Sequence, residues 1–299
     1  MGTAVVGCRV CPHVHTEEAA VLHRRGSRLL VGAVALACVA LVGPSAPGGA
    51  PSGRSLPVEA VRDVVPNRVM TWNLCNPCDA SNLDRAAEIA AHAPQVIGMQ
   101  EACARDVDRI RDYLEVFHGL VYHVAHGSVL RNWGRCGGAP WNPGGFGQAI
   151  LSAAPITDRV TVEYPEGGSE DRGYLAVTTE VGGRSVRVLD THLAQRRQEE
   201  FREDQVRVLA AEVARHDRAV VLGDFNAVPD AAELDPMWAL ATDADPRCHP
   251  APAGTCEPTT DWRSKFDYVF LRGIAPRGHR VVRTPHSDHD MLYADLDVT

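Results

Sequence analysis

Apolar and polar positions follow two alternating periods from Arg68 to the end of the chain. Short apolar runs, typical of buried strands, occupy residues 68–72, 95–100, 219–222, 266–271 and 291–296. Two β-rich runs, 174–181 and 184–189, are joined by Gly182-Gly183, which predicts a hairpin. The sequence therefore predicts several short strands, at least one hairpin among them.

Three segments between these runs have the helical period instead, at residues 82–93, 106–117 and 199–216. The first is predicted to bury Leu83, Ala86, Ala87 and Ala90, and the second Val107, Ile110, Leu114 and Phe117. Hairpins interleaved with single helices predict an α+β fold with mostly antiparallel pairing. No second linker follows Arg68, so we expect one domain.

Residues 127–147 are rich in glycine and carry Trp133, Trp141 and Phe146. We interpret them as one long loop. Loops of this length are often functional. A surface loop tied down by a disulfide through Cys136 is an equally good interpretation.

The first 50 residues have the pattern of an export signal. Arg24, Arg25 and Arg28 precede an uncharged apolar run, 29–42, which small residues and proline follow. A membrane anchor or a lipoprotein attached at Cys38 would be the alternatives, but the run is short for a membrane span. We expect 1–50 to be a signal peptide, 51–66 a Pro/Gly/Ser linker and 67–299 the catalytic domain of a secreted protein.

The chain is acidic, with a formal charge of -8. Loss of residues 1–50 would remove four arginines and two glutamates and leave 26 basic and 36 acidic residues. An acidic protein that acts on a polyanion depends on local arginines and a metal ion, not on a general basic field. Acidity thus weakens a nucleic-acid reading without excluding it.

Six cysteines remain after residue 50, and an even number in an exported chain suggests disulfides. Cys248 and Cys256 flank a proline-rich loop and form the pair most readily expected. The other four, whose pairing the sequence leaves open, are Cys75, Cys78, Cys103 and Cys136. Cys75 and Cys78 could instead be half of a zinc knuckle or a redox pair, although a second paired motif is missing.

Polar residues that suit phosphate chemistry adjoin the strand-like runs in six phrases. These are Trp72-Asn73-Leu74, Gln100-Glu101, Thr191-His192-Leu193, Gly223-Asp224-Phe225-Asn226, Phe266-Asp267-Tyr268 and Ser287-Asp288-His289. Any one alone could be a turn, a helix cap or a surface charge. Together they predict metal-assisted attack on a phosphate ester.

In this order the six phrases closely resemble the endonuclease/exonuclease/phosphatase superfamily, which includes deoxyribonuclease I, from about Arg68 to Asp297. The resemblance implies a four-layer α/β/β/α sandwich with two central, mostly antiparallel sheets. It also implies hydrolysis of phosphate esters with Mg²⁺ or Mn²⁺, with Ca²⁺ as a further structural ion.

The resemblance assigns the metal and the attacking water to five residues. Glu101 offers the hard oxygen that Mg²⁺ prefers, and Asp288 serves a second metal arrangement. Asn73 provides an amide beside the metal and the phosphate. Asp224 orients or deprotonates the attacking water, and Asn226 holds that water or a phosphate oxygen.

Both histidines and one arginine complete the predicted site. His289 contacts the phosphate and transfers a proton, with Asp267 fixing its tautomer. His192 matches the second histidine of the deoxyribonuclease I and phosphatase branches, which favours a secreted nuclease or phosphoesterase over a DNA-repair enzyme. No acidic partner for His192 emerges from the spacing, so the identity of the general acid stays open. Arg172 is expected to contact the substrate phosphate, although a solvated loop charge is a competing interpretation.

The sequence thus predicts an exported, metal-dependent endonuclease, monomeric and with nucleic acid as its substrate. The alternatives are a sphingomyelinase-like lipid phosphodiesterase, an inositol-phosphate phosphatase and an inactive binding module. Trp133 and Trp141 favour the lipid alternative, since tryptophan suits a membrane interface. The binding module would require losses among Glu101, Asp224, Asn226 and His289, and all four are present.

Overall fold

The computed structural model describes residues 63–76, 78–249 and 255–299, which all belong to one compact unit. The predicted signal peptide lies outside these residues, as does the predicted linker up to residue 62. The last two linker positions, Val65 and Pro66, belong to the first strand instead. Within the described part of the chain, no helix is both long and apolar enough to span a membrane.

The elements follow one another along the chain in a largely β order. They are β1 (Val65–Asn73), α1 (Asn82–His92), β2 (Pro94–Cys103), α2 (Ala104–His118), β3 (His123–Arg131), α3 (Trp133–Cys136), β4 (Gly138–Ala139), β5 (Asn142–Pro143), β6 (Gly145–Ser152), β7 (Thr157–Glu163), β8 (Gly173–Val181), β9 (Arg184–His192), α4 (Glu199–Val213), β10 (Ala219–Asp224), η1 (Ala232–Leu234), α5 (Asp235–Trp238), β11 (Thr242–Asp243), β12 (Asp267–Arg272), β13 (Ala275–Val282) and β14 (Met291–Asp297).

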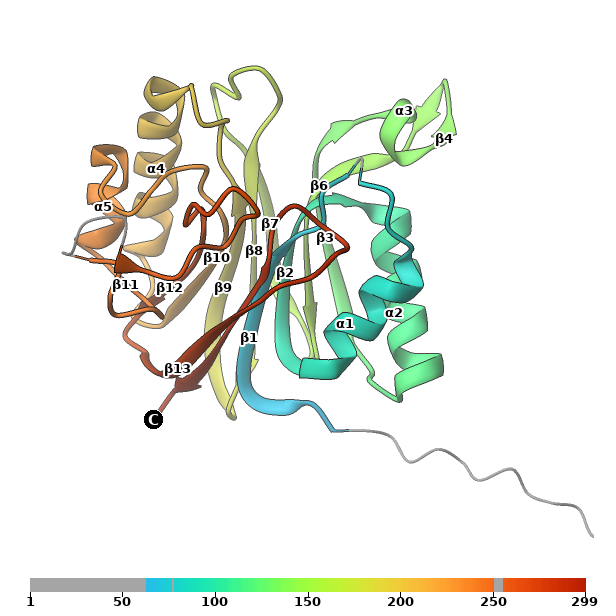
Figure 1. Ribbon diagram of the computed structural model, residues 1–299, viewed down its shortest axis with the longest axis horizontal. Coiled ribbons are helices and arrows are strands. Elements are labelled where there is room, and N and C mark those ends of the chain that lie inside the picture. The colour runs from blue at the N-terminus through green and yellow to red at the C-terminus, as the bar shows by residue number, and fades with distance from the viewer. Residues whose placement is uncertain (1–62, 77, 250–254) are drawn as a thin grey trace, which may run out of the picture. The chain divides into compact units, whose positions relative to one another are not determined.

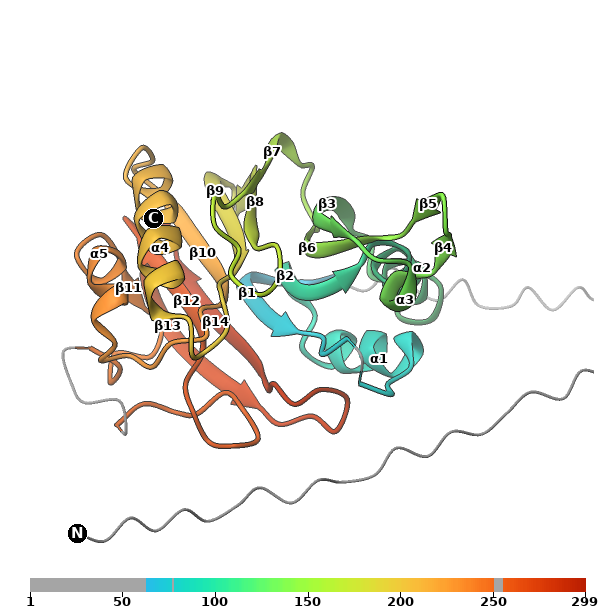
Figure 2. The ribbon, with the colours of Figure 1, turned by 90° about the horizontal axis from the view of Figure 1, so that it is seen from above.

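Two six-stranded sheets pack face to face, and helices cover their outer faces (Figure 1 and Figure 2). The strand order is β13-β14-β1-β2-β6-β3 in the first sheet and β11-β12-β10-β9-β8-β7 in the second. Helices α1 and α2 lie against the first sheet, and α4 and α5 against the second. Only the β1–β2 and β9–β10 pairs of these sheets are parallel among the described strands. This is the predicted α+β sandwich of four layers.

Alternation along the strands explains the layers. In β10, Val220 and Leu222 face the core between the two sheets, whereas Ala219 and Val221 face the core under α4. A strand buried on both faces needs apolar residues at every position. The continuous apolar run at 219–222 has this pattern, and its last residue leads directly into the site at Asp224.

The helix faces were predicted less well. Leu83 and Phe117 are 46% and 52% exposed, and Ala87 is exposed too. Near the start of α1, the buried face is taken by Arg85, whose guanidinium donates to the Leu74 carbonyl oxygen at 2.8 Å. Residues 127–147 are not one loop either, because β3 and β6 enter the segment from both ends and α3, β4 and β5 lie inside it.

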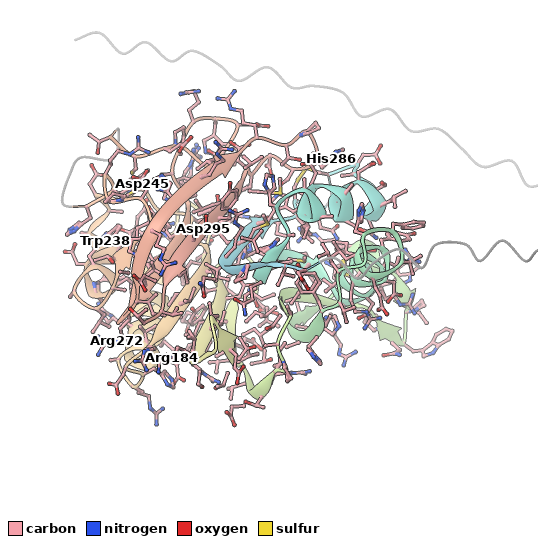
Figure 3. The ribbon with its side chains drawn as sticks, turned by 90° about the horizontal axis from the view of Figure 1, so that it is seen from below. Arg184, Trp238, Asp245, Arg272, His286 and Asp295 are labelled. Atoms are coloured by element: carbon pink, nitrogen blue, oxygen red, sulfur yellow. A yellow bond between two sulfur atoms is a disulfide. The ribbon has the colours of Figure 1, made fainter. Side chains whose placement is uncertain are left out.

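Two of the expected disulfides are formed, Cys75–Cys78 and Cys103–Cys136. A bond within Cys75-x-x-Cys78 leaves no thiolates for the zinc-knuckle alternative. The predicted Cys248–Cys256 disulfide is wrong: the two buried sulfur atoms are hydrogen-bonded and not covalently joined. This bond raises the pKa of the Cys248 thiol, which therefore stays protonated. Figure 3 labels the neighbouring Trp238 and Asp245.

Candidate active site

Three predicted residues lie side by side where three neighbouring strands of the second sheet begin or end. In β10, Asp224 is in register with His192 of the parallel strand β9 and with Asp267 of the antiparallel strand β12. Side chains in register on neighbouring strands project from the same face of a sheet. The strand pairing therefore brings together residues that are far apart in sequence.

The first sheet contributes from its own strand ends. Asn73 ends β1, and its Nδ2 donates to Asp224 Oδ2 at 3.0 Å, which joins the two sheets. Its Oδ1 accepts from the Cys75 backbone N–H at 2.9 Å, and its carbonyl oxygen accepts from Ser287 Oγ at 2.7 Å. The Asn73 amide is thus fixed from both ends.

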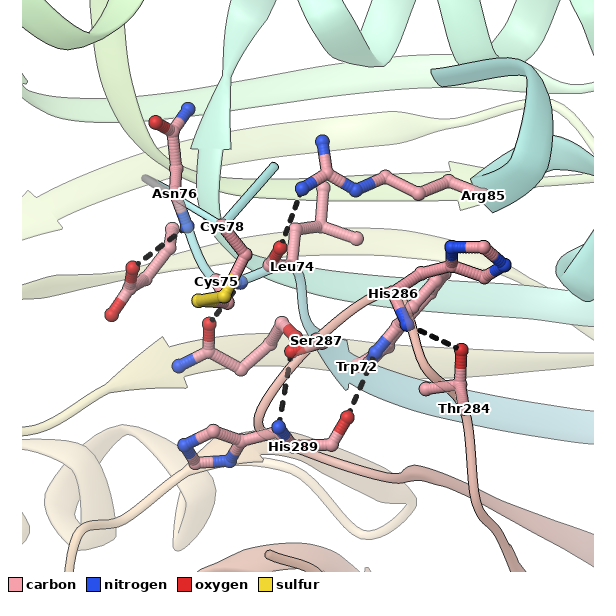
Figure 4. Close-up of a disulfide and its surroundings, with 12 residues drawn as sticks. Trp72, Leu74, Cys75, Asn76, Cys78, Arg85, Thr284, His286, Ser287 and His289 are labelled. Atoms are coloured by element: carbon pink, nitrogen blue, oxygen red, sulfur yellow. Dashed lines mark hydrogen bonds between the residues drawn. A yellow bond between two sulfur atoms is a disulfide. The ribbon is translucent and has the colours of Figure 1, made fainter. Parts of the chain in front are cut away.

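Glu101 lies at an irregularity of β2, where the register with β6 shifts between Met99 and Ala102. Its φ is +51°, a left-handed value that is rare for a residue other than glycine. Strained backbone of this kind is found where a site needs a side chain in an unusual direction. The Asn76 backbone N–H donates a hydrogen bond to Glu101 Oε2 at 3.0 Å (Figure 4).

Four contacts hold His289 in place. Its backbone N–H donates to Ser287 Oγ at 3.0 Å, and its carbonyl oxygen accepts from Trp72 Nε1 at 3.2 Å (Figure 4). Its ring Nδ1 lies 2.8 Å from Asp267 Oδ2, and its Nε2 lies 3.6 Å from Asp224 Oδ2. The imidazole is therefore placed between two carboxylates.

These carboxylates set the charge of the site. Burial alone would lower the pKa of His289, but Asp267 and Asp224 raise that pKa to about 10. Burial likewise favours a raised pKa for Asp224, yet His289 and His192 hold it below its ordinary value. At neutral pH, the site contains an imidazolium beside an ionised Asp224.

The raised pKa predicts a pH-dependent stability. The interactions of His289⁺ are fully present below its unfolded pKa of about 6.5 and are lost as the pH rises towards 10. We expect the difference in unfolding free energy between wild type and His289→Gln to shrink by up to about 4 kcal/mol over this range. Urea unfolding in chelator measures it, and a difference that does not change with pH would contradict the assignment.

His192 lies between a basic partner, Arg172, and an acidic partner, Asp224, neither of which its spacing in the sequence indicated. Arg172 Nη1 lies 2.8 Å from His192 Nδ1. Because arginine can only donate, Nδ1 must accept, and the ring proton is on Nε2. His192 Nε2 lies 3.1 Å from Asn226 Nδ2 and 3.3 Å from Asp224 Oδ2. Asn226 Nδ2 donates to the Leu193 carbonyl oxygen at 3.2 Å, so the Nε2 proton of His192 is directed to Asp224.

A pocket of about 520 Å³ opens over these groups. It is lined by seven of the nine predicted catalytic, metal and phosphate residues, namely Glu101, Arg172, His192, Asp224, Asn226, Asp288 and His289. The other two, Asn73 and Asp267, are buried and contact the lining from behind. The structure thus gathers the whole predicted set around one cavity.

Four lining residues were not predicted: Gln195, Arg196, Trp262 and Phe266. The Trp262 ring is 44% exposed and packs edge-on against His289, with 5.5 Å between the ring centroids. Phe266 was assigned to a strand only. Three of these residues lie in loops that have no recognisable sequence pattern: Gln195, Arg196 and Trp262. The one signal that could have indicated them is their short distance in the chain from His192 and Asp267.

The endonuclease/exonuclease/phosphatase family model matches residues 70–289, most of the chain. The chain belongs to this family. Enzymes of the family are metal-dependent phosphoesterases, which agrees with the carboxylates, histidines and arginine around the pocket.

Solved structures of the same fold have varied activities in their names. D. rerio TDP2 in complex with a single-strand DNA product is 20% identical, with a TM-score of 0.60 over 77% of this chain and 98% of that one. Sphingomyelinase C from Streptomyces griseocarneus is 20% identical, with a TM-score of 0.54 over 77% of this chain and 99% of that one. A family member from Beutenbergia cavernae is 23% identical, with a TM-score of 0.61 over 77% of this chain and 70% of that one. No curated protein sequence matches this chain. The likenesses establish the fold and leave the substrate open.

The residues present fit the divalent metal on which enzymes of the family depend. Glu101 and Asp288 offer carboxylate oxygens to the pocket, and few protein ligands suffice for Mg²⁺, since water and phosphate complete its octahedron. Asp224, Asp267 and His289 also have ligand atoms within 4.8 Å of one another. Because Asp267 and His289 are hydrogen-bonded together, Glu101 and Asp288 are the carboxylates that remain available to hold a metal.

Asp190 supports Glu101 from the opposite sheet. Its buried carboxyl accepts from Gln100 Nε2 at 2.5 Å through Oδ1. Gly98 makes room for it, since a Cβ there would lie 2.6 Å from Asp190 Oδ1. Burial raises the pKa of Asp190 well above its ordinary value. Asp190 therefore anchors the residue before Glu101.

This contact predicts a change in metal requirement. Asp190→Asn keeps an acceptor oxygen for Gln100 Nε2 and should leave the Mg²⁺ concentration for half-maximal activity within about threefold of wild type. Asp190→Ala should raise it by about 10- to 100-fold, because Glu101 loses its support. Mg²⁺ titration of activity measures both. An alanine variant that is less stable but has the wild-type Mg²⁺ requirement would show that Asp190 is only structural.

Proposed function

We propose that this protein is a divalent-metal-dependent phosphodiesterase that cleaves nucleic acid internally. The observation that carries the reaction type is the convergence of His289, His192 and Asn73 on one ionised carboxylate, Asp224, in a pocket that Glu101 also lines. This set can hold a water and a phosphate at once.

Each residue has a separate part. Asp224 stays ionised and orients the attacking water by accepting a hydrogen bond from it. Asn226 holds a phosphate oxygen. His289⁺ donates from Nε2 to the phosphate, and Asp267 maintains its charge and orientation. His192 donates an Nε2–H hydrogen bond to a phosphate oxygen, and the bond from Arg172 to Nδ1 keeps the ring proton on Nε2. A divalent cation at Glu101 would supply neutralisation of the negative charge that develops on the phosphate.

Trp262 supports nucleic acid as the substrate. A half-exposed aromatic ring beside the phosphate-handling histidine offers a face on which a nucleobase can stack. Arg172 and Arg196 line the same pocket and provide positive charge in an otherwise acidic chain. A lipid phosphodiesterase is the second candidate, which exposed Trp133 and Trp141 favour. We also propose, from the sequence, that the protein is exported, and disulfides suit an oxidising compartment.

A side-by-side assay tests the proposal. The purified full-length protein should nick supercoiled plasmid with Mg²⁺ or Mn²⁺, and chelator should abolish this activity. RNA, sphingomyelin and inositol phosphates are compared under the same conditions, with Asp224→Asn as the control for contaminating nucleases. Sphingomyelin hydrolysis with intact plasmid would overturn the nucleic-acid proposal and favour the lipid candidate.

A further inference from the structure

Residues 131–145, which we call the arm, leave the first sheet between β3 and β6. The arm contains α3, β4 and β5, which protrude beside that sheet in both ribbon views (Figure 1 and Figure 2). At its surface Trp133 is 57% exposed and Trp141 87% exposed. Two tryptophans exposed to this extent on one short segment indicate a contact surface.

The arm is also free of acidic residues. No Asp or Glu occurs between Glu115 and Asp158, in a chain that has 38 of them, whereas Arg131 and Arg135 lie within the arm. The arm thus offers a polyanion an approach without the repulsion expected from the rest of this acidic chain.

One disulfide and two linked ion pairs connect the arm to the active site. The Cys103–Cys136 disulfide ties it to β2, two residues beyond Glu101. Arg135 Nη1 pairs with Glu170 Oε1 at 2.6 Å, and the other Glu170 oxygen lies 3.1 Å from Arg172 Nη1. Because Arg172 lines the pocket, the arm has a fixed place relative to the scissile phosphate.

We propose that the arm binds a single strand of the nucleic-acid substrate beyond the scissile phosphate. Trp133 and Trp141 stack on bases, and Arg131 contacts a backbone phosphate. Stacking on exposed aromatic rings with positive charge nearby is how proteins hold single strands without reading their sequence. This inference rests on the proposed function, since the strand is the substrate of that site.

The composition of the arm favours a strand over a bilayer. A membrane-inserting segment buries several aliphatic side chains along with its aromatic ones. Apart from Trp133 and Trp141, the exposed residues of the arm are two glycines, a proline, an asparagine and the two arginines, and none is aliphatic. Stacking needs only the two flat rings.

The test compares the double variant Trp133→Ala/Trp141→Ala with Phe117→Ala. Phe117 is a matched control because it is 52% exposed and lies at the end of α2, outside the arm. We expect the double variant to raise KM for a long single-stranded oligonucleotide by about 10- to 100-fold. Hydrolysis of bis(4-nitrophenyl) phosphate, which is too small to span pocket and arm, should stay within about threefold, and the control should match wild type.

Other outcomes separate this inference from the proposed function. An unchanged KM for the oligonucleotide in the double variant overturns the role of the arm but leaves the nuclease intact. Hydrolysis of the small diester by wild type, with no cleavage of any nucleic acid, overturns the proposed substrate and the arm with it. Binding to sphingomyelin–phosphatidylcholine vesicles that the double variant loses, with unchanged oligonucleotide kinetics, assigns the arm to a bilayer.

Discussion

Replacing His289 with alanine should lower kcat by about 10²- to 10⁴-fold. The ring is placed between Asp267 and Asp224, and these two carboxylates keep it charged at neutral pH. Its loss removes a positive hydrogen-bond donor from the position where the phosphate gains negative charge. Steady-state kinetics on plasmid or oligonucleotide with saturating Mg²⁺ measures the loss.

A companion variant distinguishes the charge of the ring from its presence. Asp267→Asn leaves the ring in place but removes the carboxylate that raises its pKa, so we expect a smaller loss that worsens as the pH rises. Circular dichroism should show that both variants are folded. Wild-type kcat in a folded His289→Ala would refute the proton-transfer and phosphate-contact role.

The strand ends explain why so much of the site could be predicted from the sequence. Asp224 and His192 are the last residues of the buried strands β10 and β9, and a rigid buried strand fixes the position of the residue at its end. The phrases around Asn73 and Asp267 obey the same logic on β1 and β12. Local pattern was thus enough to identify the residues, although it gave no distances between them.

The features that the sequence did not predict depend on strand register and on contacts between the two sheets. His192 seemed to lack an acidic partner because only the register of β9 with β10 brings Asp224 beside it. Its basic partner, Arg172, lies just outside β8, where Gly173 is in register with His192. Spacing in the sequence did not reveal the role of Asp190, because its contact is with Gln100 of the opposite sheet. Cys248 and Cys256 were paired because they flank a loop, and flanking does not decide between a covalent bond and a hydrogen bond.

Replacing Asp224 with asparagine should lower kcat by about 10²- to 10⁴-fold, and added metal should not restore it. Three donors converge on Asp224 Oδ2, from Asn73 at 3.0 Å, His192 at 3.3 Å and His289 at 3.6 Å. An asparagine amide has only one acceptor oxygen, and the Asn226 backbone N–H already donates to the other Asp224 oxygen at 2.8 Å. The variant would therefore turn an N–H group towards these donors and leave the water without an acceptor.

The matched variant is Glu101→Gln, which keeps the shape of the side chain and removes one metal-binding charge. Its activity should recover in part as Mg²⁺ is raised, because the weakened metal site can still be filled at higher concentration. Mg²⁺ titrations of both variants on the same oligonucleotide separate the two roles. If Asp224→Asn recovered with Mg²⁺ and Glu101→Gln did not, the two assignments would have to be exchanged: Asp224 would be the metal ligand, and Glu101 would hold the water.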